Sequence, residues 1–128
     1  MNIQDTEFVT EKVKDYFNPN ILRAETLFSD GFNGSIDGKQ ALIAINALVE
    51  RLDNYYFEFD YSQSEFWEID ARYMGFYVDF VRKLRNTLEC ICGDVNKPLL
   101  AQECRRLKRR ADMSGWTKDD VITMLKDV

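Results

Sequence analysis

Histidine is absent from this 128-residue sequence. Its absence excludes the Ser–His and Cys–His pairs of nucleophilic catalysis, and it excludes any histidine acting as a general base. The chain has three cysteines, an odd number from which no disulfide framework follows. Because a zinc site usually takes four Cys or His ligands, these three thiols alone do not complete one. We therefore expect no catalysis, no metal and no other cofactor, and we expect the cysteines to be reduced core residues.

Proline is also scarce, since Pro19 and Pro98 are the only two, and long stretches are therefore free to form helix. Long apolar runs are missing too. The most apolar stretch, ALIAINALV at 41–49, is far shorter than the ~20 residues of a membrane span. The first 20 residues mix charges with apolar residues, unlike a signal peptide. With 45% apolar residues the chain is too hydrophobic to be disordered. We expect one soluble domain over residues 1–128, located in the cytoplasm.

Charged residues are numerous, but acids and bases are distributed unevenly along the chain. Residues 1–70 hold 14 acids and 5 bases, a net charge of −9. Residues 71–128 hold 8 acids and 12 bases, a net charge of +4, which brings the whole chain to −5. This asymmetry predicts an acidic face and a basic face, and it favours partners of opposite charge.

Apolar residues recur every three or four positions along most of the chain, which is the spacing of helices. The first two predicted helices are separated at Asn18-Pro19, because the residue before a proline avoids the α region. Residues 29–38 are rich in glycine and polar residues and predict a loop. The predicted helices cover residues 5–17, 19–28, 37–54, 64–92, 98–111 and 117–126. The fold class is therefore all-α, a single compact domain of five to six helices.

One segment does not fit this pattern simply. Residues 54–70 read NYYFEFDYSQSEFWEID, and from Tyr55 to Tyr61 every second residue is aromatic, which is strand spacing. No second strand is obvious in the sequence, and a lone strand cannot satisfy its own backbone hydrogen bonds. Two interpretations stay open. The short segment near 55–61 is either an extended connection held by its aromatic residues, or a strand that pairs across a homodimer.

The same segment is the main candidate for a binding surface. Between Asp53 and Asp70 the chain carries six acids and no base. Tyrosine and tryptophan inside a charged rim are common at the energetic centres of protein interfaces. The alternative is that the aromatic residues only fill the core while the acids solvate it. The predicted partner-binding residues are Asp53, Tyr55, Tyr56, Glu58, Asp60, Tyr61, Glu65 and Glu68.

The pair Tyr55-Tyr56, with Asp53 and Glu58 nearby, resembles in composition the sites of small acidic helical immunity proteins. Proteins of that family neutralise basic nuclease toxins with acids around a tyrosine pair. The likeness does not extend to the order or spacing of residues along the chain. What it implies is an inhibitor that occludes a basic partner protein, with electrostatic attraction speeding their encounter.

A second charged feature is the run ECRRLKRRAD, within the helix expected over 98–111. Leu100, Cys104, Leu107 and Ala111 share one stripe of that helix, and cations cover much of the rest. A basic face of this kind could hold nucleic-acid phosphates, or it could be solvated or paired with the acidic half of the chain. The residues of this alternative nucleic-acid site are Arg105, Arg106, Lys108, Arg109 and Arg110.

Overall fold

The computed structural model describes residues 7–92 and Ile122 of the chain. The described part contains α1 (Glu11–Asn33), α2 (Gly38–Glu58), the 3₁₀ turn η2 (Tyr61–Gln63) and α3 (Trp67–Cys92), and it contains no strand. The all-α class is therefore confirmed for these residues. The count of five to six helices is not confirmed. The helices expected over 98–111 and 117–126 lie outside the described residues, apart from Ile122, which is helical and buried.

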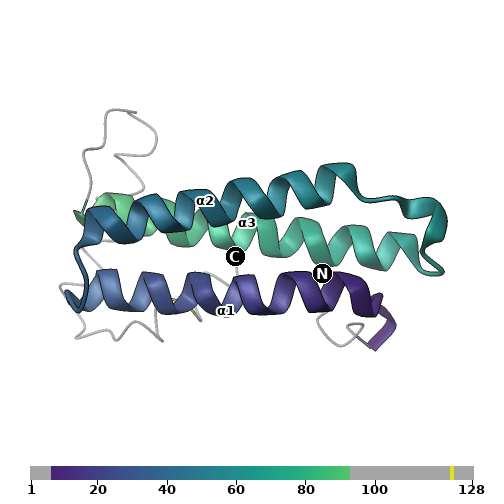
Figure 1. Ribbon diagram of the computed structural model, residues 1–128, viewed down its shortest axis with the longest axis horizontal. Coiled ribbons are helices and arrows are strands. Elements are labelled where there is room, and N and C mark those ends of the chain that lie inside the picture. The colour runs from purple at the N-terminus through teal and green to yellow at the C-terminus, as the bar shows by residue number, and fades with distance from the viewer. Residues whose placement is uncertain (1–6, 93–121, 123–128) are drawn as a thin grey trace.

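The three long helices lie side by side as an up-down-up bundle, in which each helix contacts the other two (Figure 1). The connection between α1 and α2 lies at one end of the bundle. The other end is formed by the start of α1, the end of α2, the connection 59–66 and the start of α3. We call this second end the acidic end, because the acid-rich segment 53–70 lies there.

The core forms because each helix repeats apolar residues every three or four positions and so presents one continuous apolar face. On α1 the buried apolar residues are Val13, Phe17, Ile21, Ala24 and Phe28. On α2 they are Ala41, Ile45, Leu48, Val49 and Leu52. On α3 they include Met74, Val78, Val81, Leu84 and Leu88, and Ile122 joins the same cluster. Each large buried side chain contributes about 1.5–3 kcal/mol to the stability of the fold.

The helix break predicted at Asn18-Pro19 is wrong, since α1 continues through Pro19 to Asn33. Phe17 and Ile21 are both buried, so the apolar face before the proline stays in phase with the face after it. The proline itself is exposed on the outer side of the helix. Burial on both sides therefore outweighs the ~3 kcal/mol that a proline costs inside a helix. The predicted loop over 29–38 likewise shrinks to a short turn that begins at Gly34, whose φ of 81° is left-handed.

The strand interpretation of residues 55–61 is also wrong. Helix α2 runs on to Glu58, beyond the predicted end at residue 54, and only Phe59 and Asp60 adopt extended backbone before η2. The extended connection is thus correct for two residues. The aromatic residues of this segment also fit the helical period, because Leu52, Tyr55 and Phe59 continue the apolar face of α2. The long helix predicted from residue 64 begins at Trp67.

Two glycines inside helices provide a matched test of how closely the helices pack. A Cβ added at Gly31 of α1 would lie 2.8 Å from the Cβ of Ala41, whereas one added at Gly75 of α3 would lie 3.5 Å from the nearest atom, the hydroxyl of Tyr56. Alanine is favoured over glycine in a helix by about 1 kcal/mol. Overpacking a core costs about 1–3 kcal/mol.

We therefore expect Gly75→Ala to raise the free energy of unfolding by about 0.5–1 kcal/mol, and Gly31→Ala to lower it by about 1 kcal/mol. Urea denaturation followed by circular dichroism measures both changes. A Gly31→Ala protein as stable as Gly75→Ala would contradict the close contact between α1 and α2 at this position.

Candidate functional site

A buried carboxylate holds the acidic end together. Asp70 lies in the first turn of α3 and is fully buried. Its Oδ1 accepts a hydrogen bond from the backbone N–H of Thr10 at 2.8 Å, and its Oδ2 accepts one from the Thr10 hydroxyl at 2.6 Å. The hydroxyl of Ser64 also donates to Oδ2. One side chain therefore ties together the residue before α1, the connection 59–66 and the start of α3.

Aromatic rings pack against one another across the same end. The rings of Tyr16 and Tyr55 are stacked, with centroids 4.1 Å apart and planes 11° from parallel. Phe59 meets Tyr61 edge to face at 4.9 Å, and Tyr61 meets Trp67 at 6.4 Å with an angle of 74° between planes. Rigid rings in mutual contact give this end a defined shape.

The two central phenols are neutral at neutral pH. Burial raises the pKa of Tyr55, and the neighbouring Tyr16 and Asp70 add to the shift. Burial is also the main cause that raises the pKa of Tyr61, with smaller effects from Tyr56 and Asp70. Each phenol donates a long hydrogen bond to a backbone carbonyl, Tyr55 to Lys12 and Tyr61 to Tyr56, both at 3.5 Å.

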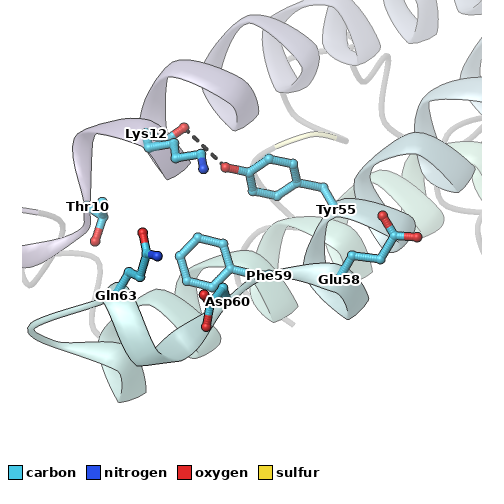
Figure 2. Close-up of a pocket in the computed structure, with 7 residues that line it drawn as sticks. All are labelled: Thr10, Lys12, Tyr55, Glu58, Phe59, Asp60 and Gln63. Carbon is cyan, nitrogen blue, oxygen red and sulfur yellow. Dashed lines mark hydrogen bonds between the residues drawn. The ribbon is translucent and has the colours of Figure 1, made fainter.

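A cleft of about 330 Å³ opens between the start of α1 and the end of α2. Figure 2 shows Tyr55 reaching from α2 toward Lys12, with Glu58 at one side and Thr10 and Gln63 at the other. We call it the charged cleft. Its lining residues are Thr10, Lys12, Tyr55, Glu58, Phe59, Asp60 and Gln63.

A second, more open cleft of about 570 Å³ is lined by Tyr56, Tyr61, Ser62, Trp67 and Ala71, and we call it the aromatic cleft. Phe59 lines the charged cleft, Tyr61 lines the aromatic cleft, and their rings are in contact. This ring contact therefore links the linings of the two clefts. Three of the five residues that line the aromatic cleft present rings, so its surface is mainly apolar with electron-rich faces.

Most of the residues predicted from the sequence do come together. Tyr55, Glu58 and Asp60 line the charged cleft, and Tyr56 and Tyr61 line the aromatic cleft. The agreement has a simple cause, because these residues are near neighbours along the chain and one helix end with its connection carries them all. The prediction of their binding role is a separate matter that their positions do not decide.

The remaining predicted acids divide into two kinds. Asp53 lies outside both clefts, where its Oδ2 is 3.0 Å from Nη2 of Arg82 on α3. The carboxylate of Asp53 therefore forms an ion pair within the chain. Glu65 and Glu68 are exposed at the acidic end but line neither cleft.

Asp60 has a local structural role in addition to its place in the charged cleft. Its Oδ1 accepts hydrogen bonds from the backbone N–H of Ser62 at 3.1 Å and from the Ser62 hydroxyl at 2.6 Å. These bonds, the hydroxyl bond most of all, lower the pKa of the Asp60 carboxyl. Asp60 is therefore the N-cap of η2, and its carboxylate is exposed to solvent.

The sequence missed several residues of the two clefts. Thr10 and Lys12 come from the start of α1, more than forty positions before the segment they face, and no local pattern indicates that contact. Phe59, Gln63 and Trp67 belong to the segment itself but were not among the predicted binding residues. The helical period would have found Trp67, since it starts α3 and is not on the buried face of that helix.

Large apolar side chains are exposed mainly at this end. The idea that the aromatic residues of the segment only fill the core is wrong for Phe57, which is 88% exposed, and for Trp67, which is 53% exposed. Phe8 and Phe66, both partly exposed, meet edge to face at 5.3 Å. Exposed rings grouped in this way are a feature of interaction surfaces.

Other kinds of site receive no support from the described residues. No group of three or more Cys, Asp or Glu within residues 7–92 could hold a metal ion. None of the helices in this part of the chain is long and apolar enough to cross a membrane. The alternative nucleic-acid site, Arg105 to Arg110, lies outside the described residues. Comparison with protein-family models, with curated proteins and with solved structures gave no match.

Proposed function

We propose that this chain is a binding module and not an enzyme, and that its acidic end docks on a basic surface of a partner protein in the cytoplasm. Occupation of that surface would inhibit the partner by steric occlusion. The observation that carries the proposal is that the charged cleft and the aromatic cleft lie at the same end of the bundle, linked by the contact between the Phe59 and Tyr61 rings, where exposed acids and exposed rings also gather.

The acids of this end are available to a partner. Glu58, Glu65 and Glu68 are exposed and form no ion pair within the described part of the chain, in contrast to Asp53 with its arginine. Exposed charges of one sign attract an oppositely charged protein from a distance and orient it before contact. The acidic end therefore favours fast encounter with a basic surface.

The rings supply the short-range part of the interaction. Trp67 and Phe57 present large apolar area, and an aromatic side chain loses little conformational entropy when it is covered. The three hydrogen bonds to Asp70 hold α1, α3 and the connection in place before any partner arrives. Such preorganisation reduces the entropy lost on binding.

A matched pair of charge reversals tests the proposal. The double substitution Glu58→Lys with Glu65→Lys reverses two exposed acids of the acidic end, and Asp15→Lys with Glu50→Lys reverses two exposed acids on the helices. Both change the net charge of the chain equally. We expect the first pair to reduce capture of the partner from a lysate of the native cells by about tenfold or more, and the second pair to leave capture near the wild-type level.

Quantitative mass spectrometry of the captured proteins measures the difference, and circular dichroism checks that both variants are folded. The proposal requires that the protein lost with the first pair is basic. Equal recovery with the two pairs would refute it. Capture of nucleic acid in place of protein, sensitive to substitution of residues 105–110, would assign binding to the basic run instead.

A further inference from the structure

We infer that the aromatic cleft binds the cationic head group of an arginine or lysine side chain from the partner protein. This inference rests on the proposed function, because it names the part of the acidic end that receives the partner's charge. It assigns recognition to the ring faces of Tyr56, Tyr61 and Trp67.

The geometry of the rings suits a cation. The rings of Tyr61 and Trp67 meet edge to face, at 74° with centroids 6.4 Å apart, and both residues line the cleft. Tyr56 adds a third ring, and the other two lining residues, Ser62 and Ala71, are small. The face of an aromatic ring carries partial negative charge and attracts a cation placed over it, tryptophan most strongly. Trp67 is 53% exposed, so part of its ring is accessible from solvent.

Two hydroxyl groups of the cleft are already engaged within the protein. The Tyr61 hydroxyl donates to the carbonyl of Tyr56, and the Ser62 hydroxyl donates to Asp60. A ligand therefore finds few free hydrogen-bonding partners among these groups. What the cleft offers is aromatic rings, with acids and one base next to its lining residues in sequence, which favours a cation over an anionic group.

The two clefts also differ in the charge of their lining residues. Among the described residues that line them, Lys12 carries the only positive charge, and it lies in the charged cleft. There Lys12 interacts with Asp60 and offsets part of the negative charge of Glu58 and Asp60. The aromatic cleft has no basic lining residue; in sequence, the acids Asp60 and Glu68 adjoin its residues Tyr61 and Trp67, and the base Arg72 adjoins Ala71. The aromatic cleft suits a cationic side chain because it offers three rings and no competing base among its lining residues.

The first measurement uses the full chain carrying Trp116→Phe, in which Trp67 is the only tryptophan. An arginine hexapeptide is titrated at low salt, where attraction between exposed charges is least screened, and the emission of Trp67 is recorded. A citrulline hexapeptide of the same length serves as the neutral control. We expect a saturable change in emission with the arginine peptide and no change with the citrulline peptide.

The second measurement locates the contact by calorimetry with the same arginine peptide. Trp67→Leu keeps an apolar side chain but removes the ring, and it is expected to weaken binding about three- to tenfold. Ile43→Ala removes an exposed apolar side chain near the start of α2, at the opposite end of the bundle, and it is expected to leave the affinity unchanged.

The outcomes separate this inference from the proposed function. If Glu58→Lys with Glu65→Lys weakens binding while Trp67→Leu leaves it unchanged, the inference is overturned and the docking of a basic partner still holds. If the arginine peptide fails to bind at all, the inference is overturned as well. In that case the capture experiment alone decides the proposed function.

Discussion

Replacing Asp70 with alanine is expected to lower the free energy of unfolding by about 3 kcal/mol. The buried carboxylate accepts three hydrogen bonds, two from Thr10 and one from Ser64. A hydrogen bond to a charged group contributes about 1.5–3 kcal/mol. The expected loss of stability is smaller than the sum over the three bonds, because Thr10 and Ser64 are partly exposed and can form hydrogen bonds with water instead. The melting temperature should fall by about 10 °C or more, measured by circular dichroism.

Asp79 provides the matched control. Its carboxylate is 3.2 Å from the Nζ of Lys83, and its side chain is 60% exposed. Surface ion pairs of this kind contribute about 0–1 kcal/mol, so Asp79→Ala should change stability little. Equal loss of stability in the two variants would mean that Asp70 does not tie the acidic end together. We further expect Asp70→Ala, at a temperature where it is folded, to weaken partner binding, because Thr10 lines the charged cleft.

Asp70 also illustrates what the sequence could not reveal. In the sequence it counts as one more acid of the segment 53–70, with no sign that it is buried. Its two donors in Thr10 lie sixty positions earlier in the chain, and they approach it only because α1 and α3 pack side by side. A contact across the bundle leaves no local pattern. The sequence therefore treats the acids of the segment as one group and misses the different role of this one.

The period of apolar residues explains the other agreements and errors. Over the long helices many turns repeat the same spacing, so the all-α class and the helical nature of 37–54 and 64–92 could be predicted from the sequence. Over Tyr55 to Tyr61 only a few residues are available, and alternation and helical spacing both fit them. Residues 55–58 are helical because Tyr55 continues the buried face of α2 and stacks on Tyr16 of α1.

Replacing Pro19 with alanine is expected to stabilise the protein by about 2 kcal/mol. A proline inside a helix costs about 3 kcal/mol, because it has no N–H for the carbonyl four residues earlier and its ring crowds that carbonyl. Alanine restores the donor within α1. Part of the gain is lost, since proline also restricts the unfolded chain, an effect of about 0.4–1 kcal/mol in favour of the wild type. The melting temperature should rise by about 5–10 °C.

Leu22→Ala is the control for this change, because Leu22 is exposed on the same helix. Leucine and alanine are both good helix formers. It should leave the melting temperature nearly unchanged. A fall in stability with Pro19→Ala would mean that the proline shapes α1 for its contact with α3, where the Tyr73 hydroxyl donates to Asn18. Burial raises the pKa of that phenol to about 12, so it stays a donor at neutral pH. A gain in stability would instead show that α1 is continuous in spite of its proline, because its apolar face is buried on both sides of residue 19.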